Sequence, residues 1–122
     1  MSSQAHYERI VDQISGILKL NGYTVFKEAR VTKGFTSSVV DLLGEKGNTK
    51  VVFEVQTRPA SFDALAAITR VNSKHRFIVA PGWVDAEFES AAKKDGVSLL
   101  TIEEVEKAGQ HPSWLNGSKS LG

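Results

Sequence analysis

The stretch that decides the fold is residues 38–56, which read SVVDLLGEKGNTKVVFEVQ. Two apolar segments rich in β-branched residues flank the turn-forming residues Gly44 to Asn48. This pattern predicts strands over 38–43 and 50–56 that form a hairpin. Apolar residues occupy both parities of the second segment, so that strand is predicted to lie centrally in a sheet with both faces covered.

Upstream of this hairpin, the sequence predicts a helix and a further strand. Apolar residues recur at helical spacing over residues 4–20, and Asn21 and Gly22 form a helix stop. Residues 23–30 are rich in aromatic and β-branched residues, which predicts a strand, and residues 32–36 are predicted to form a loop.

Downstream of Pro59, helices and short strands are predicted to alternate. The helices are expected over 61–70, 84–94 and 102–107, and the strands over 76–80 and 97–100. Ser61 is a plausible N-cap, and Thr101 with Glu104 fits a capping box. The order α-β-β-β-α-β-α-β-α predicts an α/β domain over 1–108, with a mixed sheet flanked by helices, and a polar C-terminal tail over 109–122.

The composition excludes several classes of protein. The chain has 122 residues, which fits one domain, and it has no cysteine, so disulfides, thiolate zinc sites and cysteine nucleophiles are excluded. No apolar stretch approaches the ~20 residues that cross a bilayer, and no signal-peptide pattern opens the chain, so we expect a cytoplasmic, intracellular protein with no membrane partner. The net charge of +1 neither requires nor forbids nucleic acid.

Two carboxylates stand inside apolar strands. Asp41 and Glu54 both have apolar neighbours on either side, and a buried charge is unfavourable unless it is paired or bound to a metal. Two such groups on neighbouring strands repel each other, and a divalent cation between them offsets that repulsion. The alternative is a buried salt bridge to Lys27, Arg30 or Arg58.

Glu54 and Gln56 are two residues apart in a strand, so their side chains are predicted to point to the same face. A metal held by Asp41 and Glu54 would then lie near Gln56. Hydrolysis of a phosphodiester requires carboxylates that hold the ion, an activated water, and a group that stabilises the negative charge on phosphate.

These residues resemble the signature of the PD-(D/E)xK nuclease superfamily. Val40 and Asp41 are followed, after twelve residues, by Glu54, Val55 and Gln56, with Val40 at the proline position and Gln56 at the lysine position. The resemblance implies a restriction endonuclease-like fold in which Asp41 and Glu54 bind Mg²⁺ or Mn²⁺ and Gln56 orients the attacking water.

The flanking segments extend the resemblance over residues 7–107. The helix that carries Tyr7 and Glu8 resembles the opening of archaeal Holliday-junction resolvases, in which the helix glutamate joins the metal site. By this resemblance Glu8 is a candidate third ligand, although a solvated glutamate early in a helix is the simpler interpretation. Residues 77–92 and 96–100 resemble the end of Mrr-type restriction endonuclease domains.

The activity implied by the resemblance is that of a metal-dependent deoxyribonuclease, an endonuclease that hydrolyses branched or duplex DNA as a homodimer. Four residues are candidates for contact with DNA, namely Arg30, Lys33, Ser38 and Arg58. The alternative for the basic residues is an ordinary solvated surface, and for the serine the start of a strand.

A second hypothesis is a catalytically weak or inactive DNA-binding or assembly module that retains the nuclease fold. Gln56 favours it, because an amide carries no charge. A third, an α/β binding protein unrelated to nucleases, lacks support, since the sequence has no glycine-rich phosphate loop and no nucleophile elbow.

Overall fold

The computed structural model describes residues 2–33, 36–58, 60–71, 73, 75–82 and 85–115. The elements follow the predicted order α-β-β-β-α-β-α-β-α. In chain order they are α1 (Ser2–Leu20), β1 (Thr24–Lys33), β2 (Thr36–Lys46), β3 (Thr49–Val55), α2 (Phe62–Thr69), β4 (His75–Ala80), α3 (Ala86–Lys94), β5 (Val97–Thr101) and α4 (Ile102–Glu106).

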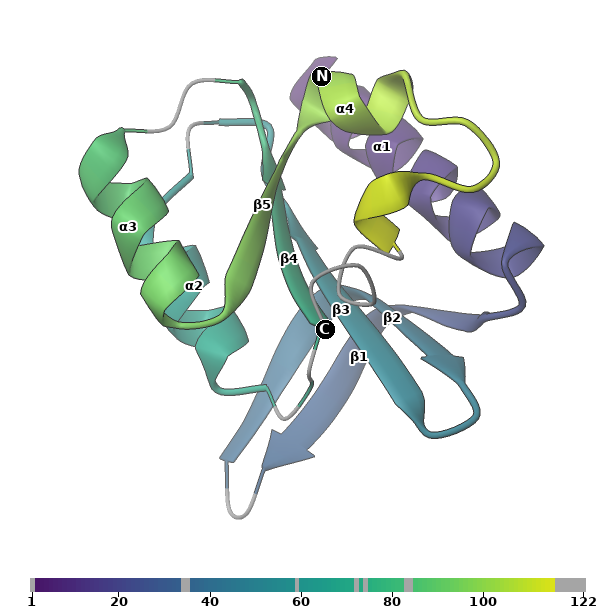
Figure 1. Cartoon of the computed structure of the whole chain (residues 1–122), viewed down its shortest axis with the longest axis horizontal. Helices are drawn as coiled ribbons and strands as arrows, with labels where there is room; N and C mark the ends of the chain where they lie inside the picture. The colour runs from purple at the N-terminus through teal and green to yellow at the C-terminus, as the bar shows by residue number, and fades with distance from the viewer. Residues whose placement is uncertain are drawn as a thin grey trace.

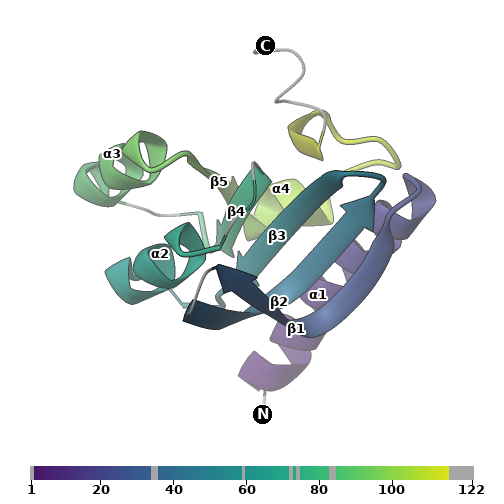
Figure 2. The ribbon, with the colours of Figure 1, turned by 90° about the horizontal axis from the view of Figure 1, so that it is seen from below.

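The strands form one mixed sheet in the spatial order β1-β2-β3-β4-β5. The pairs β1–β2 and β2–β3 are antiparallel, whereas β3–β4 and β4–β5 are parallel. Helices α1 and α4 cover one face of the sheet, and α2 and α3 cover the other (Figures 1 and 2). The prediction of a mixed sheet with helices on both faces, and with β3 at its centre, is confirmed.

Each face of the sheet has its own hydrophobic core. On the α1 face, Ile10, Ile14 and Leu18 are fully buried, and their spacing of four residues places them on one side of the helix. The aromatic rings of Phe53 and Phe77 stack on this face with centroids 4.7 Å apart. On the other face α2 contributes a second apolar cluster that meets the opposite side chains of β2, β3 and β4. The sheet is therefore held from both sides along its central strands.

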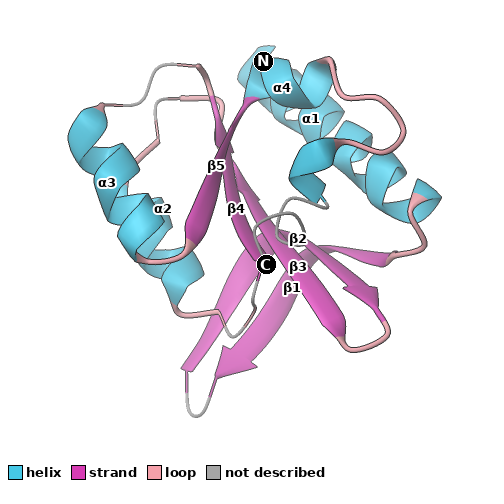
Figure 3. Cartoon of the chain, viewed as in Figure 1, coloured by secondary structure: helices cyan, strands magenta, loops and turns pink. Residues whose placement is uncertain are grey.

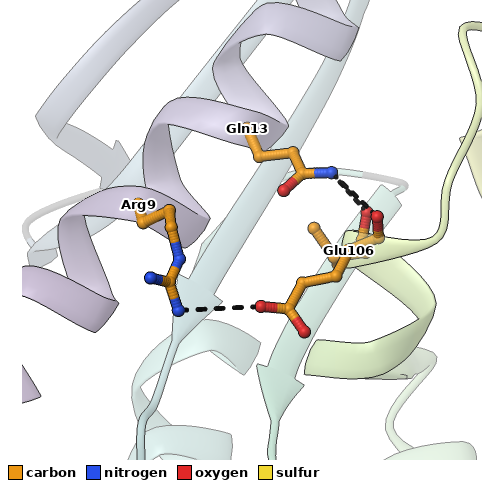
Figure 4. Close-up of polar contacts among 4 residues, drawn as sticks. Arg9, Gln13 and Glu106 are labelled. Atoms are coloured by element: carbon orange, nitrogen blue, oxygen red, sulfur yellow. Dashed lines mark hydrogen bonds and ion pairs between the residues drawn. The ribbon is translucent and has the colours of Figure 1, made fainter.

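Helix α4 is tied to α1 by polar contacts near its C-terminal end. The Gln13 side-chain amide donates to the carbonyl oxygens of Val105 (3.0 Å) and Glu106 (3.3 Å), and Arg9 lies 3.8 Å from the Glu106 carboxylate (Figure 4). The ion pair is exposed, so it contributes little stability. The two hydrogen bonds from the Gln13 side chain fix the position of α4 against α1.

The hairpin strands are longer than the sequence predicted. Of the loop predicted over 32–36, Thr32, Lys33 and Thr36 belong to strands instead, and residues 34 and 35 lie outside the described residues. Thr32 pairs with Ser37 and Lys33 with Thr36, so the ladder continues almost to the tip. This end of the β1–β2 hairpin extends beyond the helices (Figure 3). Cross-strand hydrogen bonds and β-branched residues favour the extended ladder over a loop.

The turn between β2 and β3 is also shorter than predicted. Gly44 belongs to β2 and pairs with both Val25 and Val51. A Cβ atom on Gly44 would lie 2.9 Å from the Val51 side chain, so this glycine serves close packing within the sheet. The turn itself is formed by Gly47, with φ 61°, and Asn48.

The predicted caps are confirmed, and one more is found. The Ser61 hydroxyl accepts from the Ala64 N–H at 3.2 Å, and the capping box of Thr101 and Glu104 has both of its hydrogen bonds. Helix α3 begins later than predicted, because Asp85 caps it. Val84, the predicted start, lies outside the described residues.

Part of the predicted polar tail lies against the core through Trp114 and Leu115, whereas residues 109–111 are exposed. The Trp114 ring meets Phe53 and Phe77 edge to face, and Pro112 and Leu115 are buried. Such burial of aromatic and apolar surface stabilises the packing of this segment on the α1 face. None of the helices in the described part of the chain has the length and apolar character needed to cross a bilayer.

Candidate functional site

Asp41 and Glu54 meet where β2 and β3 separate. The β2–β3 ladder runs from Lys46 opposite Thr49 to Leu42 opposite Phe53 and stops one residue before Asp41. Beyond this point, the Val55 N–H donates to Asp41 Oδ2 at 2.7 Å. The aspartate side chain thus replaces the backbone acceptor that a continued β2 would have supplied.

A local twist of the β1–β2 hairpin brings Asp41 to this position. Val25 and Leu42 pack on the α1 face, whereas Ala29 and Val40 pack on the α2 face. Strict alternation would keep all four on one face, because Lys27 pairs with Leu42 in the same register. The change occurs at Glu28, whose φ of 49° is unusual for a residue other than glycine. Such strained backbone is often found at functional sites.

The second oxygen of the Asp41 carboxylate is bound by a tyrosine of α1. The Tyr7 hydroxyl donates to Asp41 Oδ1 at 2.6 Å, across 34 residues of sequence. Burial and this hydrogen bond raise the pKa of Tyr7 well above its ordinary value, so the hydroxyl keeps its proton. The sequence predicted the helix that carries Tyr7, but it did not predict this contact with Asp41.

Glu54 carries the unfavourable charge of the pair. Burial, and then the negative charge of Asp41, raise the pKa of Glu54 to about 7, although a hydrogen bond from the Asp41 backbone opposes the shift. Glu54 is therefore expected to gain or lose its proton near neutral pH. A cation between the two carboxylates would favour the charged form.

The alternative of a buried salt bridge is not observed in the described part of the chain. The three ion pairs found there do not include Asp41 or Glu54. Lys27 binds Asp12 instead, and the Arg30 guanidinium donates to the Ser37 hydroxyl at 3.3 Å. Lys27 and Arg30 thus contact other partners, and no cation of the described residues pairs with either carboxylate.

Gln56 follows β3 directly and is anchored at both its backbone and its side chain. Its N–H donates to the Val79 carbonyl at 2.8 Å, and its Oε1 accepts from the Ser61 N–H at 3.2 Å. Since a backbone N–H only donates, the amide oxygen must face Ser61. The NH₂ end of the amide is thus the end that remains for a ligand.

Glu8 and Asp41 line the same pocket. Glu8 is exposed on α1 and accepts a hydrogen bond from Gln4 at 3.2 Å, and the pocket has a volume of about 320 Å³. The pocket is bounded by Gln4, Tyr7, Glu8, Val11, Asp12, Lys27, Glu28 and Asp41. Among the described residues, no three acidic or histidine side chains are grouped as a metal site, so the structure brings Asp41 to Glu54 but does not join Glu8 to them as a third ligand.

Three of the predicted DNA-contacting residues lie on the β1–β2 hairpin and the fourth follows β3. Arg30 is exposed on β1, and Ser38 is half-buried on β2, opposite Val31. Arg58 is exposed two residues after Gln56. Lys33 ends β1, but its side chain lies outside the described residues.

Comparison with known proteins identifies the fold rather than a family. No family model matches the chain, and no curated protein matches it. Solved structures, in contrast, match it in their fold. The protein of unknown function AF1548 superimposes with a TM-score of 0.62 and 14% identity, over 94% of this chain and 67% of its own.

Two further structures have similar scores but are longer proteins. VC1899 from Vibrio cholerae matches with a TM-score of 0.58 and 9% identity, over 92% of this chain and 32% of its own. EndoMS, in a complex with double-stranded DNA, matches with a TM-score of 0.57 and 18% identity, over 83% of this chain and 44% of its own. The chain therefore spans less than half of each. With the strand order, these neighbours confirm the predicted restriction endonuclease-like fold.

Proposed function

We propose that the chain is a divalent-metal-dependent DNA endonuclease with Asp41 and Glu54 as the metal ligands. One observation carries this proposal: two half-buried carboxylates meet at the separating ends of β2 and β3, and neither belongs to an ion pair of the described residues. A buried pair of like charges is unfavourable in itself. A cation that both carboxylates share would explain why such a pair stands in a well-packed sheet.

The donor set suits Mg²⁺ or Mn²⁺. Mg²⁺ is commonly held by one or two carboxylates and completes its octahedral shell with waters and substrate phosphates. Asp41 and Glu54 supply two such oxygen ligands. When bound, the ion would polarise the phosphate and lower the pKa of a bound water. Glu8, which lies across Asp41 on α1, is proposed as an outer partner of the same site.

Gln56 is proposed to donate a hydrogen bond to the scissile phosphate or to the attacking water. Its Oε1 already accepts a hydrogen bond from Ser61, so the side chain can offer a ligand its two N–H donors. A lysine at this position would supply donors as well, together with a positive charge. Without that charge, the stabilisation of negative charge on phosphate is weaker, and a slow enzyme is the expected result.

DNA is proposed as the substrate because the fold is shared with a protein solved in a complex with double-stranded DNA. Arg30, Lys33, Ser38 and Arg58 are proposed to contact its backbone, since phosphate contacts from basic and hydroxyl side chains position a duplex. A homodimer is proposed as well, because cutting both strands requires two sites and two-fold dimers are the commonest assembly.

The second candidate function is a DNA-binding or assembly module without catalysis. Gln56 is the observation that favours it, because the position lacks the charge that the superfamily's lysine supplies. Such a module would bind DNA, yet it would not cut it.

The test is a cleavage assay with Mg²⁺ or Mn²⁺ on a linear duplex, a supercoiled plasmid and a four-way junction. Asp41→Ala and Glu54→Ala are compared with Asp63→Ala, which removes an exposed carboxylate of α2. Cutting that both site variants abolish and Asp63→Ala retains supports the enzyme. Metal binding and DNA binding without cutting support the module. If the wild-type protein binds no metal, the assignment of the site is wrong.

A further inference from the structure

The Asp41 carboxylate is held on both sides by donors from two different elements. Tyr7 of α1 binds Oδ1 at 2.6 Å, and the Val55 N–H of β3 binds Oδ2 at 2.7 Å. Two hydrogen bonds, one at each oxygen, fix the plane of a carboxylate as well as its position. Each oxygen still has a second lone pair for another partner.

The tyrosine is itself well placed to fix this geometry. Its ring packs against the core of the α1 face, so the direction of the hydroxyl is set by apolar contacts. Tyr7 and Asp41 line the same pocket between α1 and the sheet. Within the described residues, no other side chain donates a hydrogen bond to Asp41. The rotamer of Asp41 therefore depends on Tyr7 more than on any other side chain.

We infer that Tyr7 is a positioning residue for the metal ligand Asp41, which it holds so that the free lone pairs face the ion shared with Glu54. This inference rests on the proposed function, since it takes Asp41 as a ligand. Groups that bind the ligands of a metal orient them, and their removal commonly weakens metal affinity about 10-fold to 100-fold. Tyr7 acts through Asp41 and touches neither the ion nor the DNA.

The experiment compares Tyr7→Phe with Tyr23→Phe by calorimetric titration of the full chain with Mn²⁺. Both changes remove only a hydroxyl, and both rings pack on the α1-face core, but Tyr23 has no side-chain hydrogen bond among the described residues. Tyr7→Phe is expected to weaken Mn²⁺ binding about tenfold. Tyr23→Phe is expected to bind Mn²⁺ as the wild type does.

A second readout separates positioning from general stability. The two variants are melted with and without Mn²⁺, and circular dichroism confirms that both are folded. Positioning predicts that Tyr7→Phe reduces the shift in melting temperature that Mn²⁺ produces, and that higher Mn²⁺ concentration restores the shift. A merely structural hydrogen bond would lower the melting temperature equally with and without metal.

The outcomes distinguish the inference from the proposed function. If the wild type binds Mn²⁺ and Tyr7→Phe binds it equally or more tightly, the inference is overturned and the proposed function stands. If Tyr23→Phe weakens binding as much as Tyr7→Phe does, the effect is not specific and the inference also fails. If the wild type binds no Mn²⁺, both are overturned.

Discussion

The two halves of β3 differ in what they stabilise. Val51, Val52 and Phe53 are almost completely buried and pair with β2 on one side and β4 on the other. Glu54 and Val55 keep their pairing with β4, but the β2 ladder has ended, and the Asp41 side chain takes its place. Val51 to Phe53 form a continuous apolar run, whereas the end of the strand brings Glu54 to the Asp41 carboxylate of β2.

The difference shows how a small domain can hold an unfavourable site. Charges that repel each other at the end of β3 persist only because the rest of the strand is fixed by apolar packing and by a ladder on each side. Substitutions in the first half should therefore affect the whole fold, whereas substitutions in the second should affect charge, metal and pH dependence.

The largest effect is expected for Phe53→Ala. Phe53 is fully buried, stacks on Phe77 and meets Trp114 edge to face, so its loss leaves a cavity beside these two aromatic rings. We expect the free energy of unfolding to fall by about 3–5 kcal/mol, measured by urea denaturation.

The matched control is Phe62→Ala, because Phe62 is 51% exposed and its ring meets Phe88 edge to face. We expect that variant to lose about 1 kcal/mol or less. Equal losses for the two phenylalanines would show that the first half of β3 is not the stabilising half.

Much of the fold follows from local pattern in the sequence. The helical stripe of α1, the apolar run of β3 and the cap at Ser61 are each specified within a few neighbouring residues, and each is found as predicted. The strand ends are less local, because Thr32 and Ser37 join the sheet only through their pairing across the hairpin.

The candidate site was predictable in part for the same reason. Asp41 and Glu54 stand out because charge interrupts apolar strands, and the structure brings them together. The Tyr7 hydrogen bond joins residues 34 positions apart, and the φ of Glu28 has no signature in composition, so neither is visible in the sequence. Such features depend on how the helix packs across the sheet, and the pattern of neighbouring residues in the sequence does not specify this packing.

A smaller effect, with a definite pH dependence, is expected for Glu54→Gln. The pKa of Glu54 is about 7 in the folded protein and 4.5 in its unperturbed state, so the folded protein holds one more proton between these values. Stability of the wild type therefore falls as pH rises from about 4.5 to about 7. Glutamine removes this dependence, so the variant is expected to be more stable by about 1–2 kcal/mol at pH 8 and equally stable at pH 4, allowing for solvent screening.

The measurement is urea denaturation of wild type and variant at the two pH values without metal. The control is Glu87→Gln, at an exposed position of α3. It should change the free energy of unfolding only slightly, and by the same amount at pH 4 and at pH 8. A gain for Glu54→Gln that is the same at pH 4 and pH 8 would mean that the charge of Glu54 is not its cause. A loss at pH 8 would show that the carboxylate is favourable where it stands.

The smallest effect concerns the chain after β3, where Ser61 ties the second half of the strand to α2. The Ser61 N–H binds Gln56, and its hydroxyl caps the helix at Ala64. Ser61→Ala removes the cap but keeps the backbone donor, so it should lower the free energy of unfolding by about 1 kcal/mol and leave Mn²⁺ affinity unchanged. Ser61→Thr, which can still cap, should restore most of that stability. If Ser61→Ala instead weakens Mn²⁺ binding severalfold, the capped helix takes part in holding the carboxylate end of β3, and the two halves of the strand are less separate in function than their packing indicates.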